Sequence, residues 1–244
     1  MHRRYVLSAL MASALLFGTA AVDPRPDFSG VWERFPDPYN ESDEYPPPPG
    51  DGPVLKEPYA STWKAWTERV KAGDRDGRPV ADDSTRCLPE GMPTIMGAVY
   101  PIEIFQTPRQ MVVLAELFTQ TRRIFLDDPM PKEDEIVPSY NGYSVGHFEK
   151  DVLVIETRGV RDDIKFAPFG IPHSRRMKIT ERLRLVGADQ MEDSFTIEDP
   201  EVLAKPYVFT FGYKRKPDYK IIEYYCDNNR SRIDADGKVG LDIK

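Results

Sequence analysis

The sequence is poor in the residues that most often hold metal ions and poor in long apolar runs. Its 244 residues include 2 cysteines and 3 histidines, without the C-x-x-C or H-x-x-x-H spacing of a metal site. After residue 21, no stretch approaches the roughly 20 apolar residues that a transmembrane helix needs. We therefore expect a protein without a metal, a cofactor or a membrane span.

Positive charge is outnumbered by negative charge. Lysine and arginine total 33 against 40 aspartates and glutamates, which gives a formal net charge of -7 at pH 7. Because nucleic-acid binding depends on clustered lysines and arginines, this balance argues against nucleic acid as a partner. Hydrophobic residues make up 40% of the chain, so a folded domain with its own core is expected.

The first 21 residues have the pattern of a signal peptide. The segment MHRR is basic, YVLSALMASALLFG is apolar but too short to span a membrane, and GTAA supplies the small residues of a cleavage site. We expect residues 1–21 to be removed and the mature protein to be periplasmic or secreted.

The remaining chain divides into an arm and one domain. Residues 22–56 are predicted to form an extended proline-rich arm that contains a first strand in DFSGVWERF. Residues 57–244 are predicted to form a single β-barrel domain that begins with a helix at 57–72. This helix has Pro58 in its first turn and Gly73 after its end. Its apolar residues recur at helical spacing: Trp63, Trp66 and Val70.

From about residue 100 the sequence alternates between short strands and turns. The strand-like runs are YPIEIFQ, QMVVLAEL, TRRIFLD, YSVGHFE, DVLVIET, RRMKITERLRLV, QMEDSFTIE, PYVFTFGY and YKIIEYYC. Their breaks carry proline, glycine, aspartate or asparagine, and no long helical pattern alternates with them, which disfavours parallel β-α-β units. The expected fold is all-β, an antiparallel barrel of eight to ten strands, closed or nearly closed.

The segment GYSVG matches the G-x-S-x-G pattern of a serine-hydrolase nucleophile elbow at Ser144. Such an elbow needs an apolar strand before the serine and a helix after it. Here DEIVPSYN precedes the segment, and a turn followed by a strand comes after it. The glycines are better explained by a bent or bulged hairpin strand, so a serine hydrolase is disfavoured.

Some charged residues share strand faces with apolar ones. In RRMKITERLRLV, alternation places Glu181 on the face of the methionine, isoleucine and leucines. Three more residues are assigned to such faces in the same way: Glu116, His147 and Glu223. An inward carboxylate must be paired or have a raised pKa, and a raised pKa suits a general acid or base near neutrality. A buried ion pair with Arg122 or Arg123 would explain Glu181 without any chemistry.

The two cysteines, Cys87 and Cys226, are predicted to form a disulfide, because an exported protein reaches an oxidising compartment. The bond would close a loop of about 140 residues and contribute roughly 4 to 5 kcal/mol on the chain-entropy description. The alternative is a free reactive thiol.

Ordered motifs extend over most of the chain: GVW, RCLPEGMP, QTP, GHFEKDVLVIET, FTIEDP and YYC. Together they resemble a large family of exported, mostly uncharacterised bacterial proteins, over about residues 27–229. The chain departs from that pattern after Leu126, where DDP replaces the family's D-G-R and removes an arginine. The G-x-W at Gly30 is also similar to the opening of lipocalin-like barrels. The resemblance implies export and a barrel, but no agreed activity.

These observations lead to a lipocalin-like barrel that holds one small ligand in its mouth. The predicted cavity residues are Phe209, Phe211, Tyr213 and Tyr225, with Glu116 and Glu223 as further ligand-binding candidates. The first functional hypothesis is a cofactor-free acid-base lyase or isomerase acting on a small aromatic or hydrophobic molecule. Glu181 and His147 would transfer protons, and Arg122 would stabilise an anion or oxyanion.

Two other classes stay open. A periplasmic binding protein for the same small molecules needs the cavity but no converging acid and base. A cell-envelope interaction module built around the proline-rich arm would be preferred if the barrel had no cavity.

Overall fold

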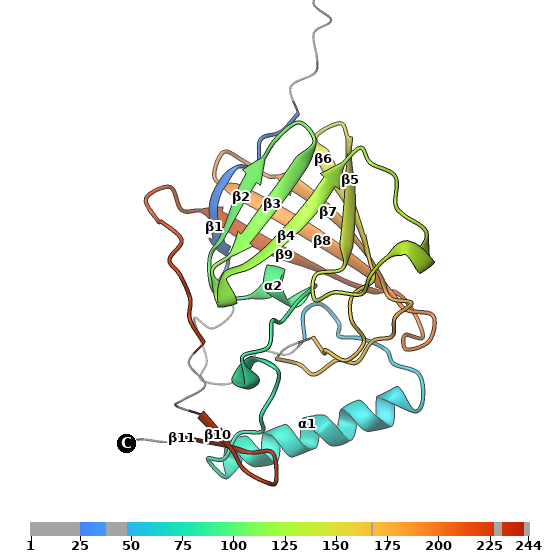
Figure 1. Cartoon of the computed structure of the whole chain (residues 1–244), viewed down its shortest axis with the longest axis vertical. Helices are drawn as coiled ribbons and strands as arrows, with labels where there is room; N and C mark the ends of the chain where they lie inside the picture. Colours follow the sequence, from blue (N-terminus) through green and yellow to red (C-terminus); the bar gives the residue numbers. More distant parts are fainter. Residues whose placement is uncertain (1–24, 38–47, 167, 227–230, 242–244) are drawn as a thin grey trace, which may run out of the picture.

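Nine strands form a closed barrel in the computed structural model, which describes residues 25–37, 48–166, 168–226 and 231–241 (Figure 1). The predicted signal peptide and part of the proline-rich arm lie outside these ranges. The barrel strands are β1 (Gly30–Arg34), β2 (Ile102–Gln106), β3 (Gln110–Ala115), β4 (Gln120–Leu126), β5 (Tyr143–Glu149), β6 (Val152–Arg158), β7 (Lys178–Leu185), β8 (Gln190–Glu198) and β9 (Tyr207–Arg215). This confirms the predicted barrel of eight to ten strands.

The barrel is mostly antiparallel, with one exception. Each strand pairs with the next, and β9 closes the barrel by pairing with β1, whose sequence belongs to the predicted arm. The pair β4 and β5 is parallel, with Ile124 opposite Ser144 and Leu126 opposite Gly146. Parallel neighbours need a long connection that returns the chain to the starting end. Residues 127–142, with the short helix η3 (Glu133–Glu135), provide it.

The prediction of a strand in YKIIEYYC was wrong. After β9, residues 219–226 run along the outside of the barrel without joining any ladder of the described chain (Figure 1). The reason is that β9 already pairs with β1, so the closed barrel has no free edge for another strand. The segment is held instead by side chains, as when the Tyr219 hydroxyl donates to Glu116 Oε2 at 2.8 Å.

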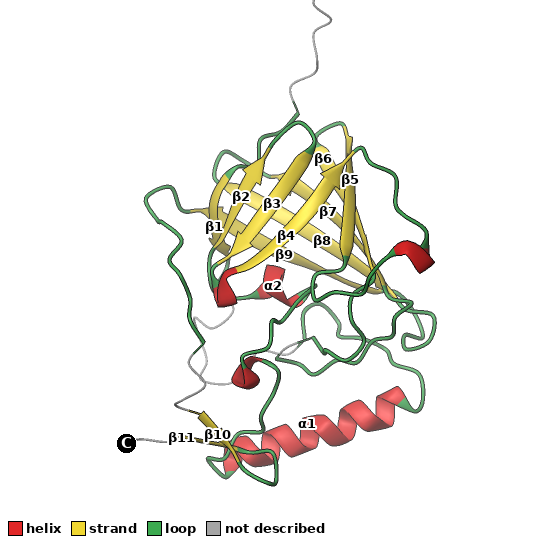
Figure 2. Cartoon of the chain, in the orientation of Figure 1, coloured by secondary structure: helices red, strands yellow, loops and turns green. Residues whose placement is uncertain are grey.

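Both α-helices of the described chain lie at one end of the barrel (Figure 2). Helix α1 (Tyr59–Arg75) confirms the predicted helix and lies below the barrel, near the ribbon of β10 (Ser231–Ile233) and β11 (Val239–Leu241). The short buried helix α2 (Thr94–Gly97) lies directly at the barrel end. Two further single turns are η1 (Ser84–Arg86) and η2 (Leu117–Thr119). No described helix is long and apolar enough to cross a membrane.

The barrel interior is apolar along most of its length. Alternation turns every second side chain inward, and the fully buried ones include Trp32, Ile104, Met111, Ile155 and Phe195. The indole of Trp32 donates to the backbone oxygen of Phe28 at 2.9 Å, which satisfies its one polar group. In β7 the buried face is the predicted one, with Ile179, Glu181 and Leu183 inward.

Candidate functional site

A cavity of about 690 Å³ lies at the barrel end beside α2. We call it the mouth cavity. Its walls come from β9, from the loop and helix of residues 82–100, and from Phe166 and residues 168–171. Helix α1 supports the last of these walls, because the Trp63 indole donates to the Phe169 carbonyl at 2.9 Å. Elements distant in sequence thus enclose one space below the strands.

One wall of the mouth cavity is aromatic. Tyr207, Phe209 and Phe211 alternate along the inner face of β9, and successive ring centroids are 4.9 Å apart. Tyr100 and Tyr224 also line the cavity, and their rings meet edge to face at 5.1 Å. Such surfaces suit a flat, apolar molecule, since stacked and edge-to-face ring pairs are both favourable.

A buried carboxyl group, Glu90, is the most unusual polar group in the mouth cavity. The residue is 9% exposed. Burial raises its pKa from 4.5 to about 7; a hydrogen bond from Ser84 opposes the shift, and the charges of Asp82 and Asp83 add to it. Glu90 can therefore gain or lose a proton near neutral pH.

Two other polar side chains line the mouth cavity near α2. The Arg34 guanidinium carbon lies 3.9 Å from the Phe211 ring centroid, and Nη1 donates to the Gly97 carbonyl at 3.0 Å. The Thr94 hydroxyl is buried and has no hydrogen-bond partner within the described parts of the chain. A ligand that reached this oxygen would satisfy it.

Glu90, Arg34 and Thr94 were not candidates from the sequence. Glu90 lies in the loop LPEGMP, where no strand or helix periodicity applies. Only its isolation among apolar and small residues could have drawn attention to it.

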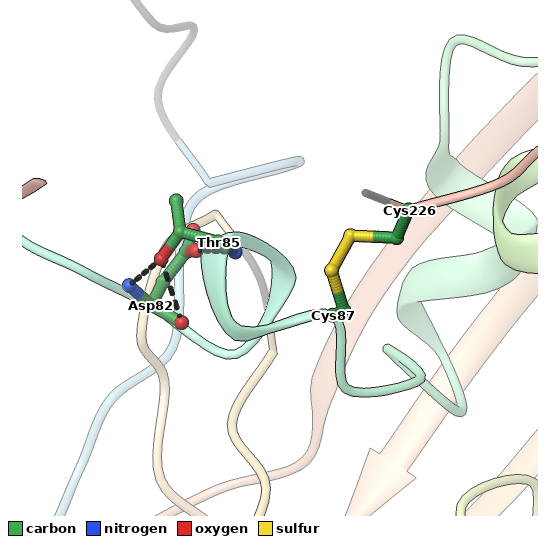
Figure 3. The surroundings of a disulfide bond; sticks show 4 residues. All are labelled: Asp82, Thr85, Cys87 and Cys226. Carbon is green, nitrogen blue, oxygen red and sulfur yellow. Dashed lines mark hydrogen bonds between the residues drawn. A yellow bond between two sulfur atoms is a disulfide. The ribbon is translucent and has the colours of Figure 1, made fainter. Parts of the chain in front are cut away.

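The predicted disulfide between Cys87 and Cys226 is confirmed (Figure 3). It joins the 219–226 segment to the residue after η1, next to the turn in which Thr85 and Asp82 exchange hydrogen bonds. This attachment holds Tyr224 against the mouth cavity. The neighbouring Tyr225, predicted to line the cavity, is 83% exposed; that prediction was wrong, because the segment is not a strand facing the interior.

Two predicted catalytic residues, Glu181 and Arg122, form a buried ion pair inside the barrel. Arg122 Nη1 donates to Glu181 Oε1 at 2.8 Å, and Nη2 donates to Oε2. Nη2 also donates to Ser144 and Thr157, at 3.2 and 3.0 Å. Glu181 is therefore half of a buried ion pair, as the alternative explanation from the sequence stated. It does not line the mouth cavity.

Next to this pair, Asp193 is fully buried, and its oxygens have no hydrogen-bond donor among the described residues. Burial, and then the negative charge of Glu181, raise the pKa of Asp193 well above its ordinary value. A protonated Asp193 can donate to the Glu181 carboxylate, whereas two ionised carboxylates would repel each other. The raised pKa of Asp193 therefore favours its neutral form beside the Arg122–Glu181 pair.

The third predicted catalytic residue, His147, is on the outer surface. Its side chain is 58% exposed, and Nε2 lies 3.6 Å from Glu149 Oε1. The predicted inward face of β5 was wrong, because Ser144 and Gly146 point inward instead. The buried Ser144 hydroxyl shares a hydrogen bond with Thr157 at 2.8 Å, which agrees with a structural serine.

The other predicted ligand-binding residues divide between the cavity and its surroundings. Phe209 and Phe211 line the mouth cavity. Tyr213 is buried beneath α2 and donates to the Met96 carbonyl at 2.7 Å. Glu116 is buried outside the cavity, where it accepts hydrogen bonds from the 219–226 segment, and Glu223 is exposed.

A second hollow of about 730 Å³ lies beside residues 198–206 and the start of β7. Its lining is strongly charged, but these charges are largely matched, as in the pairs Lys178–Glu198 and Arg176–Glu201. The mouth cavity is the better candidate site, because its polar groups are few and buried.

No family model matches the chain, and the comparison with curated proteins found no match. The resemblance to the exported bacterial family therefore stays a prediction. Within the described ranges, no group of three or more His, Cys, Asp or Glu side chains could hold a metal ion.

Proposed function

We propose that the protein binds a small aromatic or hydrophobic molecule in the mouth cavity. The observation that carries this proposal is the row of Tyr207, Phe209 and Phe211, whose inward side chains border open space. A volume of about 690 Å³ suits one small organic molecule. The confirmed disulfide is consistent with an extracytoplasmic location, so we propose a periplasmic or secreted binding protein.

A second candidate is the acid-base lyase or isomerase, now with Glu90 as the proton-transfer group. The support is that the pKa of this cavity carboxyl is raised to about 7, the range in which a general acid or base works best. Burial also raises the pKa of Tyr100 to about 12, so its phenol stays protonated at neutral pH. Binding needs only the cavity, whereas catalysis needs a second group in a suitable position, and for this reason binding is our first proposal.

A cell-envelope interaction module has less support, because that hypothesis applies to a barrel without a cavity and this barrel has one.

Fluorescence titration with the neutral aromatic dye N-phenyl-1-naphthylamine tests the binding proposal. We expect saturable binding of one dye per chain and at least about tenfold weaker binding to Phe209→Ala. The matched control is Val208→Ala, since Val208 is the adjacent residue of β9 and is 56% exposed.

Phe209→Ala removes a buried ring and lowers stability by itself, so a second variant is needed. Ala98→Phe places a ring in the mouth cavity from a wall residue that follows α2. It should abolish dye binding without lowering the melting temperature. Unchanged binding by both folded variants would contradict the proposed site.

A further inference from the structure

The mouth cavity has an acidic end. Asp82 and Glu90 both contribute to its lining, and Asp83 follows Asp82 in the chain. The charges of Asp82 and Asp83 both act on Glu90. Lys165 and Arg86, both exposed, lower the pKa of Asp83, but neither is among the groups that act on Glu90.

The cation that lines the cavity, Arg34, is engaged by groups other than Glu90. It stacks on Phe211, donates to the Gly97 carbonyl, and acts on Asp193 and Tyr213 in the barrel interior. The groups that act on Glu90 are Ser84, Asp82 and Asp83. Tyr100, which senses the charge of Glu90, brings a phenol and no positive charge.

An unsatisfied hydroxyl lies on the same segment as Glu90. Thr94 lines the mouth cavity, is 8% exposed, and its Oγ1 has no hydrogen-bond partner in the described part of the protein. A buried hydroxyl without a partner is unfavourable, because it has lost its hydrogen bonds to water. The cavity therefore offers acceptor oxygens from Glu90, Asp82 and Thr94, close to aromatic rings.

We infer that the ligand is an organic cation, a protonated amine attached to an aromatic or hydrophobic body. This inference rests on the proposed binding function and specifies its ligand class. An ammonium group donates up to three hydrogen bonds, is attracted by the faces of aromatic rings, and relieves the repulsion among neighbouring carboxylates. A neutral ligand would satisfy fewer of these groups, and an anion would add to the repulsion.

The inference predicts proton release on binding. In the free protein below about pH 7 the Glu90 carboxyl is largely protonated. An ammonium group beside it favours the carboxylate, so the proton leaves Glu90 for the solvent. Titration calorimetry at pH 6 in two buffers with different ionisation enthalpies should detect the release of up to about one proton per amine bound.

Three compounds of matched length distinguish the ligand classes: 4-phenylbutylamine, 4-phenylbutanol and 4-phenylbutyrate. We would measure their displacement of N-phenyl-1-naphthylamine at pH 8. The amine should bind at least about ten times more tightly than the alcohol, and the butyrate should bind most weakly. Glu90→Gln should remove the advantage of the amine and leave the affinity for the alcohol nearly unchanged. Glu223→Gln, which removes an exposed carboxylate of the 219–226 segment, is the charge-matched control and should change none of the three affinities.

Equal binding of the amine and the alcohol would refute the inference while the proposed function stands. Preferred binding of the butyrate would refute it too and would point to Arg34 as the dominant charge. If the dye binds but none of the three compounds displaces it, the inference also fails. Absence of dye binding would remove the proposed function itself.

Discussion

Replacing Glu90 with glutamine should make the stability of the protein less dependent on pH. Burial raises the pKa of Glu90 from 4.5 to about 7, so the folded protein holds this proton more tightly than the unfolded chain. Below pH 4.5 both states are protonated and the group has no net effect. As the pH rises to 7, the folded state loses stability, and the full loss persists at higher pH. The shift corresponds to about 3 kcal/mol.

Glutamine keeps the volume and can still accept a hydrogen bond from Ser84, but it does not ionise. The free energy of unfolding of Glu90→Gln, relative to wild type, should therefore increase by about 2 to 3 kcal/mol between pH 5 and pH 8. Urea denaturation at several pH values and constant ionic strength measures this difference, with Glu223→Gln as control. A difference that is the same at every pH would refute the reasoning, because it would mean that Glu90 titrates alike in the folded and unfolded states.

Three further changes test other parts of the structure. Glu181→Gln should lower the free energy of unfolding by about 3 to 5 kcal/mol, because Arg122 would remain buried without its counter-charge; an unchanged urea midpoint would contradict the ion pair. Replacing Cys87 and Cys226 with serine should lower the free energy of unfolding by about 4 to 5 kcal/mol and weaken dye binding. Alkylation of both cysteines in the unreduced wild-type protein would exclude the disulfide. Ser144→Ala should leave dye binding nearly unchanged, and stoichiometric labelling of Ser144 by a serine-directed phosphonate would overturn its structural role.

Strand positions were predictable because alternation and turn residues are local signals. The run YSVGHFE coincides with β5, since Gly142 precedes it and the turn at Lys150 follows it. The inward face of the same strand was not predictable, because alternation defines two faces without saying which one is buried. Packing decided it: a side chain at Gly146 would meet Ile124 and Leu153, so the glycine faces the interior and His147 faces solvent.

The disulfide was predictable because the chain has two cysteines and begins with the pattern of a signal peptide. The last predicted strand failed for a non-local reason. YKIIEYYC has the alternation of a strand, but the pairing of β9 with β1 leaves it no edge. Closure depends on the whole barrel, so no local pattern in this segment could show it.

By itself, the sequence determined the β-rich character, most strand positions, helix α1 and the cysteine pair, because these depend on neighbouring residues or on composition. The tertiary structure alone decided which polar groups meet. It placed Arg122 against Glu181, 59 positions apart, and brought Glu90 into a cavity walled by the aromatic residues of β9. The pKa of a carboxyl depends on burial and nearby charges rather than on its sequence neighbours. For that reason only the tertiary structure identified Glu90 as a candidate acid-base group.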